Sequence, residues 1–155
     1  MGSTPGPSTT IWSQKTFTLS PQSRGCYLIT PEVTSQLSEL ISPLRVGLVH
    51  LFIKHTSCGL SLNENWDADV QADMTEALER IVPYDRGGRA GLYRHAAEGD
   101  DDMPAHVKSA LVGAHVTIPV TDGALALGTW QGIWYLEFRR ARHTRTLVAT
   151  VQGTT

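Results

Sequence analysis

Hydrophobic and polar residues alternate in several short segments of the chain. Loose alternation over residues 11–19 and an apolar run at 26–30 predict two early strands. Residues 46–54 are almost continuously apolar and rich in β-branched and aromatic side chains, which predicts a strand buried on both faces. Further strands are predicted at 59–62, 115–120, 125–127, 133–138 and 146–151.

Other segments follow a helical period. The first predicted helix starts at Thr30, an expected N-cap followed by Pro31 and Glu32, and continues to residue 41. The second runs from about Asp67 to Val82, with one apolar stripe opposite an acidic face. A short helix is predicted at 104–112. Because strands and helices do not alternate regularly, the pattern favours the α+β class, with a mostly antiparallel sheet or two packed sheets.

Composition narrows the class of protein. Residues 1–10 are small and polar and predict a disordered lead-in to a single domain over 11–155. The chain has 13 Lys and Arg against 15 Asp and Glu, which argues against nucleic acid as the main partner. No apolar run is long enough for a membrane span, and the start lacks the apolar core of a secretory signal. With two cysteines in all, we expect a cytoplasmic protein.

The densest polar stretch joins the apolar strand to the second helix. It contains His55, Ser57, Glu64, Asn65 and Asp67, all near the ends of predicted elements, where side chains can converge on a cleft. Together they could supply a general base, hydrogen-bond donors and carboxylates for a divalent ion. Taken singly, Asn65 or Asp67 could only cap the helix, and Ser57 could only bond local backbone.

Three histidines lie beside or within a long polar loop at 84–103. His55, His95 and His106 could hold Zn²⁺ with one coordination position left open, although their spacing is not a zinc signature. The acidic run from Glu98 to Asp102 could bind Mg²⁺, but a hydrated loop is the favoured interpretation.

A third group lies late in the chain. Trp130 offers a flat ring and Gln131 an amide, which suit a small heteroaromatic ligand or, equally, a subunit interface. Cys58 is expected to be a small packing residue rather than a nucleophile.

Three separated motifs resemble the YjbQ-like, or UPF0047, family, some of whose members are described as secondary thiamine-phosphate synthases. They are HTSCGLSLNENWD at 55–67, Tyr93-Arg-His95 together with His106-Val-Lys-Ser109, and GALALGTWQ at 123–131. The likeness covers about residues 12–152, and the three motifs occur in the family's order.

The resemblance implies an α+β fold with a β-sandwich-like core and a homotrimer. It also implies a secondary ability to join hydroxymethylpyrimidine diphosphate to a thiazole phosphate with release of pyrophosphate. The catalytic residues that it implies are His55, Ser57, Glu64, Asn65, Asp67, His106 and Lys108. Trp130 and Gln131 would bind the ligand, and His55, His95 and His106 would hold a divalent metal, Mg²⁺ or Zn²⁺. Two other functions stay open: a non-catalytic metal or metabolite binder, and a zinc hydrolase with Glu64 as base.

Overall fold

The computed structural model describes residues 8–155, which form three α-helices and eight strands. The strands are β1 (Thr10–Thr18), β2 (Gly25–Leu28), β3 (Val46–Ile53), β4 (Cys58–Glu64), β5 (His115–Thr121), β6 (Ala124–Leu125), β7 (Gln131–Glu137) and β8 (Thr146–Thr154). The helices are α1 (Thr30–Ile41), α2 (Ala68–Ile81) and α3 (Asp102–Val112), and a 3-10 turn spans Arg86–Gly88.

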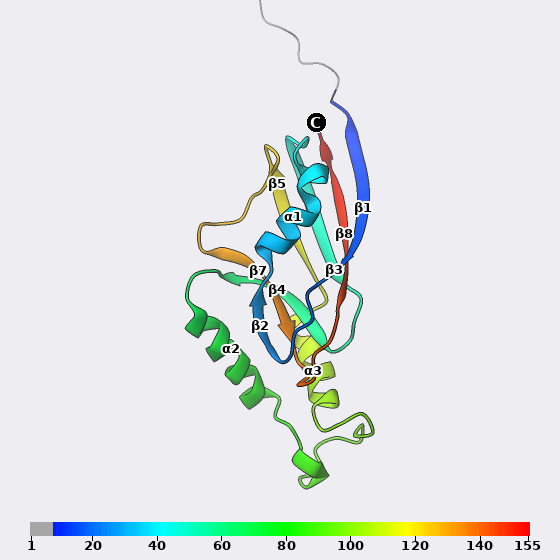
Figure 1. The fold of residues 1–155 in the computed structure, drawn as a ribbon, viewed down its shortest axis with the longest axis vertical. Helices are drawn as coiled ribbons and strands as arrows, with labels where there is room; N and C mark the ends of the chain where they lie inside the picture. Colours follow the sequence, from blue (N-terminus) through cyan, green and yellow to red (C-terminus); the bar gives the residue numbers. More distant parts are fainter. Residues whose placement is uncertain (1–7) are drawn as a thin grey trace, which may run out of the picture.

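The strands form two antiparallel sheets (Figure 1). The larger has the order β1-β8-β3-β5-β6, and the smaller has the order β2-β7-β4. The last strand of the chain, β8, lies between β1 and β3, with Thr10 opposite Thr154 at one end of the sheet. The predicted α+β class with two packed, mostly antiparallel sheets is therefore confirmed.

Two apolar layers hold the elements together. Between the sheets, Leu51 and Ile118 of the larger sheet share a core with Leu60 and Tyr135 of the smaller one, and α1 packs into the same layer. On the other face of the smaller sheet, residues of β7 such as Trp134 pack against α2 and α3. Successive side chains of β7 point alternately into one apolar layer and the other, so this strand is buried on both faces.

The expectation that residues 46–54 are buried on both faces is wrong. In β3 only alternate side chains face the core, and Val46, Leu48 and Phe52 are exposed on the outer face. No helix or second sheet of the described chain covers this face, and exposed Trp12 of β1 lines a hollow on it together with Leu48. The larger sheet therefore presents an uncovered apolar surface.

The helix ends differ from expectation in two places. Thr30 is the first helical residue rather than the N-cap, and its hydroxyl accepts a hydrogen bond from the N–H of Ile133 (2.8 Å). Asp67, one of the two candidate caps, is the N-cap of α2, because its carboxylate accepts from the N–H of Asp69 (2.9 Å). The third helix begins at Asp102, earlier than predicted, which places part of the acidic run on the helix.

Residues 1–7 of the predicted lead-in lie outside the described residues. The prediction of disorder does not extend to Thr10, which is paired with Thr154 in the larger sheet. Among the described residues, none of the helices is both long and apolar enough to cross a membrane.

Candidate functional site

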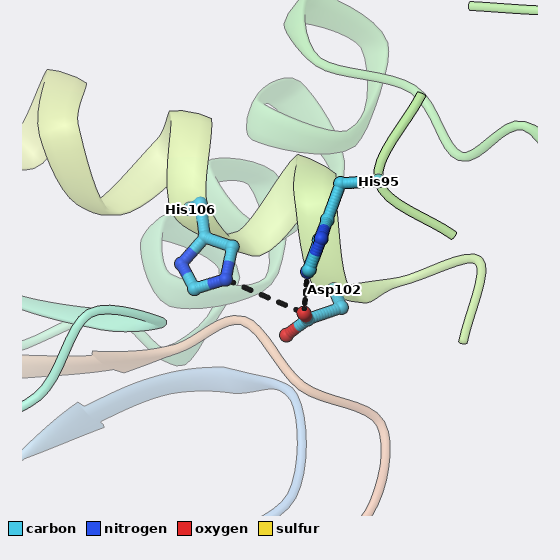
Figure 2. A group of neighbouring side chains, drawn as sticks. All are labelled: His95, Asp102 and His106. Atoms are coloured by element: carbon cyan, nitrogen blue, oxygen red, sulfur yellow. Dashed lines mark hydrogen bonds and ion pairs between the residues drawn. The ribbon is translucent and has the colours of Figure 1, made fainter. Parts of the chain in front are cut away.

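A loop and the first turn of α3 bring together three side chains with metal-binding atoms (Figure 2). His95 comes from the loop, whereas Asp102 and His106 lie one helical turn apart on the same face of α3. The Nε2 atom of His95 lies 2.7 Å from Oδ2 of Asp102, and that of His106 lies 3.3 Å from the same oxygen. One ligand atom from each residue lies within 4.8 Å of the others. The group thus offers two imidazole nitrogens and one carboxylate oxygen around one point.

The second ring nitrogen of His106 indicates which atom is free for a metal. Its Nδ1 lies 2.9 Å from the carbonyl oxygen of Thr56, which can only accept, so Nδ1 is assigned the proton. In the neutral ring, Nε2 then carries a lone pair that faces a carboxylate oxygen of Asp102, which is also an acceptor. The two atoms are 3.3 Å apart, so one cation could bind both of them. Histidines that bind metals usually donate their other ring N–H to a carbonyl or carboxylate, and the Nδ1 of His106 fits that pattern.

Arg139 holds the side of the Asp102 carboxylate that faces away from the histidines. The Asp102 side chain is buried, and its Oδ1 forms an ion pair with Nη1 of Arg139. The same guanidinium donates to Oδ2 of Asp101 (3.2 Å) and to the carbonyl oxygen of Glu98 (2.9 Å). Arg139 therefore orients the carboxylate and ties it to the loop that carries His95.

The acidic run is not the hydrated loop that we expected. Burial alone would raise the pKa of Asp101, but the backbone N–H of Arg140 and the guanidinium of Arg139 outweigh it and hold the pKa below the ordinary value. The neighbouring Asp100 forms an ion pair with Arg140. The connection between β7 and β8 supplies these arginines, so each of the three aspartates has a cationic partner.

The structure places His55 outside this group. Its Nε2 accepts a hydrogen bond from the backbone N–H of Thr146 (2.8 Å), where β8 begins. Burial, and then the charge of Arg145, lower the pKa of His55, which favours the neutral ring that this bond requires. The expected set of three imidazoles is therefore corrected: Asp102 stands with His95 and His106 where His55 was expected.

Ser57 belongs to a closed, buried network. Its hydroxyl accepts from Nη2 of Arg145 (2.8 Å), and this guanidinium forms an ion pair with Glu137 (2.7 Å). The Tyr135 hydroxyl donates to the same Glu137 carboxylate (2.5 Å). The network joins β7, β8 and the start of β4, which gives Ser57 a structural role.

Lys108 is also turned away from the cluster. It is fully buried, its Nζ forms an ion pair with Glu79 of α2, and it lies 4.9 Å from the centroid of the Tyr84 ring. Burial lowers the pKa of Lys108, and the Glu79 carboxylate opposes that shift. The side chain joins α3 to α2 and offers no free amine.

The other predicted residues gather at the far end of β4. Glu64 lies opposite Gln131 of β7, and its carboxylate accepts from the N–H groups of Trp66 (2.9 Å) and Asp67 (3.0 Å). The strand from Cys58 to Glu64 spans about 20 Å, since each residue of a strand advances about 3.3 Å. Within one protomer, the predicted residues therefore form two separate groups rather than one.

An exposed pair of aromatic rings marks the far group. Trp130 and Trp66 meet edge to face with ring centroids 5.9 Å apart, and both are largely exposed. Asn65 fixes the backbone beneath them, because its Nδ2 donates to the carbonyl oxygens of Thr129 (3.2 Å) and Gln131 (3.0 Å). This part of the chain offers an exposed aromatic surface, and it lies outside the one group of three metal-binding side chains found among residues 8–155.

Two residues around the candidate metal centre, Asp102 and Arg139, are absent from the predicted site residues, although Asp102 belongs to the acidic run that could bind Mg²⁺. Asp102 and His106 have the four-residue spacing that places side chains on one helix face, but the predicted helix began two residues too late to reveal it. Arg139 follows a buried strand and carries no sequence signal for its role.

The fold and this geometry define the class: a two-sheet α+β protein with a candidate metal centre of two histidines and one aspartate. Comparison with known proteins then gives the family. Residues 15–154 match the model of the UPF0047 protein YjbQ-like family. The UPF0047 protein YjbQ of Salmonella typhimurium is 47% identical over 143 residues, which cover 92% of this chain and 99% of the relative. The UPF0047 protein YugU of Bacillus subtilis is 37% identical over 125 residues, 81% of this chain and 87% of the relative. The chain belongs to this family.

Solved structures support the fold. The conserved hypothetical protein TT1486 from Thermus thermophilus aligns with a TM-score of 0.71 and 31% identity, covering 86% of this chain and 97% of that one. A hypothetical protein from Aeropyrum pernix aligns with a TM-score of 0.77 and 26% identity, covering 91% of this chain and 98% of that one. The family model and the curated relatives confirm the YjbQ-like membership that the motifs indicate.

Proposed function

We propose that this chain is a metal-dependent enzyme whose ion is bound by His95, Asp102 and His106. The observation that carries the proposal is the convergence of two imidazole nitrogens on one oxygen of a buried carboxylate. Two nitrogens and one oxygen suit Zn²⁺ or another transition metal better than Mg²⁺, which prefers oxygen ligands alone. Three protein ligands leave positions for water or substrate.

Metal analysis tests the centre directly. The metal-free protein should take up one equivalent of Zn²⁺ or Co²⁺, and His106→Ala should weaken that binding by at least about 100-fold. His50→Ala is the matched control, because His50 lies on the uncovered sheet face, where its Nδ1 is hydrogen-bonded to Thr117 and its ring lies 5.0 Å from that of His115. Equal metal affinity in His106→Ala and the wild type would overturn the assignment.

The reaction that we propose is the one implied by the family resemblance: condensation of hydroxymethylpyrimidine diphosphate with a thiazole phosphate, releasing pyrophosphate. When bound, the metal would neutralise the charge that develops on the leaving diphosphate. His95 and His106 would orient that end of the substrate, and the Trp130 ring would stack on the pyrimidine. Since the two groups lie about 20 Å apart along β4 of one protomer, they would meet only across a subunit boundary.

Subunit mixing tests this arrangement. His106→Ala and Trp130→Ala should each abolish condensation, and refolding them together should restore about a quarter of the wild-type sites. No recovery, with both variants folded, would refute a shared site. Hydrolysis of the diphosphate without the thiazole partner would assign the centre to a hydrolase, and metal binding without turnover would assign it to a non-catalytic binder.

A homotrimer is part of the proposal. The uncovered face of the larger sheet exposes apolar side chains that a neighbouring copy would bury, namely Trp12, Val46, Leu48 and Phe52; the number three comes from the family resemblance alone. Light scattering should show a trimer for the wild type and a smaller species for Leu48→Glu. Ile81→Glu, on an exposed apolar residue of α2, is the control and should leave the mass unchanged. A monomeric wild type at micromolar concentration would contradict the homotrimer.

We also propose a cytoplasmic location, which the two buried free thiols of Cys26 and Cys58 support.

A further inference from the structure

The outer face of the larger sheet carries no side chain with a permanent charge. Phe17, Val49, Ile118 and Val151 belong to the core, so the even-numbered residues of β1, β3 and β8 and the odd-numbered residues of β5 point outward. None of these outward residues is Lys, Arg, Asp or Glu. A surface that stays in solvent is expected to carry such residues at about a quarter to a third of its positions.

The one charged residue within these four strands points the other way. Lys15 of β1 has the parity of the core residues, and its Nζ donates to the carbonyl oxygen of Gln36 on α1 (2.7 Å). The sheet therefore keeps its only strand charge on the covered side, and its outer face is suited to contact with another uncharged surface.

Two histidines are the only titratable side chains among the outward residues of these strands. His50 and His115 lie diagonally across β3 and β5, since Thr117 is opposite His50 and Phe52 is opposite His115. The centroids of the two rings are 5.0 Å apart, and Nδ1 of His50 lies 2.9 Å from the hydroxyl of Thr117. When both rings are protonated, two positive charges lie side by side on this face.

The neighbours of the pair offer no compensating charge. In the part of the chain that the structure describes, no carboxylate lies within ion-pair distance of either ring. The outward residues of the flanking strands β8 and β6 are uncharged. At this end of the sheet Lys54 follows β3 and is also positive, whereas Arg45 and Asp122 lie beyond the opposite ends of β3 and β5.

The surroundings of the pair are apolar. Leu48 and Phe52 stand two residues before and after His50 on the same face, and both are exposed. Trp12 of β1 lines a hollow of about 300 Å³ together with Leu48 and His50. In a ring of copies these faces would turn toward one another around the symmetry axis, and each would meet a surface as free of charge as itself.

We propose that pH controls the contact between copies over this face, with His50 and His115 as the groups that switch it. While both rings are neutral, the face has no charge and packs against its neighbours. Histidine gains its charge between about pH 8 and pH 5. Two charges buried without partners are costly, whereas in a separate copy water solvates them. The inference rests on the proposed homotrimer and adds the condition under which it comes apart.

Sedimentation velocity of the full chain at pH 8 and at pH 5.5 tests the switch. The apparent dissociation constant of the wild type should rise at least about 100-fold at pH 5.5. This estimate assumes about tenfold for each of two histidines at one pH unit below the ordinary histidine pKa of about 6.5. His50→Gln/His115→Gln should stay assembled at both pH values. His143→Gln, which removes a histidine from the connection between β7 and β8, is the control and should behave like the wild type.

A permanent charge tests the same electrostatics without acid. His50→Lys should dissociate already at pH 8, where far-UV circular dichroism checks that it is folded, while His50→Gln should stay assembled. An assembled His50→Lys would overturn the switch, even if the wild type unfolds at pH 5.5.

The outcomes separate this inference from the proposals on which it rests. A wild type that is equally assembled at both pH values overturns the switch and leaves the homotrimer standing, and so does dissociation of His50→Gln/His115→Gln at pH 5.5. A wild type that is monomeric at pH 8 overturns both. Metal binding and condensation are not measured, so their failure would leave these results as they are.

Discussion

Removal of the Arg139 guanidinium should leave two buried carboxylates without their main partner. The Arg139 side chain is 16% exposed, and the side chains of Asp101 and Asp102 are 8% and 2% exposed, so solvent screens these interactions little. Breaking a buried ion pair by deleting one partner costs about 3–5 kcal/mol. We therefore expect Arg139→Met to lower the free energy of unfolding of the metal-free protein by about 3–5 kcal/mol, measured by urea denaturation at pH 7.

A double-mutant cycle shows whether the effect arises from the pair. Asp102→Asn removes the charge that Arg139 neutralises, so the double variant should lose clearly less stability than the two single losses added together. A loss below about 1 kcal/mol for Arg139→Met, or strict additivity, would refute the reasoning.

The same ion pairs predict a sign for the pH dependence. Because the pKa of Asp101 is lowered in the folded chain, its contribution is present above the ordinary pKa of an aspartate, about 3.9, and is lost as the pH falls further. Arg139→Met should therefore lose less additional stability than the wild type between pH 5 and pH 3.

Three further predictions concern residues around the site. The lowered pKa of His55 means that the unfolded chain binds more protons, so stability should fall as the pH drops through about 6.5, and His55→Gln should flatten this dependence in denaturant titrations. Lys108→Met should lower stability by about 3 kcal/mol through the loss of its pair with Glu79, yet leave zinc affinity unchanged; lost zinc binding with intact stability would contradict its structural role. Gly123→Ala should lower stability by at least about 1–2 kcal/mol, since φ is +77° and the new Cβ would lie 2.8 Å from the carbonyl oxygen of Ser42; an unchanged melting temperature would disprove this.

Local pattern was enough to find most elements. The alternation and helical periods placed β3, β7 and α2 close to their observed bounds, and Asp67 was correctly among the candidate caps. Local pattern could not show that β3 has one uncovered face. An apolar strand that faces a neighbouring copy has the same composition as one that faces a second layer of its own chain.

The candidate site was only partly predictable, because residues that are close in sequence lie far apart in the structure. Residue type alone predicts two of its members, His95 and His106. The continuous motif at 55–67 favours a single cluster. That motif contains the whole of β4, and an extended strand separates its ends rather than joining them. Asp102 lies at the start of a helix that the sequence pattern places two residues later, and Arg139 joins the site through a tertiary ion pair that leaves no periodic signal.

The position of β8 has a consequence for how the chain is made. Because β8 supplies the central partner of both β1 and β3, the larger sheet cannot be completed until residues 146–154 have left the ribosome. Until then, β1 has no strand to pair with. Folding of this sheet should therefore follow the synthesis of β8, and a nascent chain arrested before residue 146 should remain sensitive to protease.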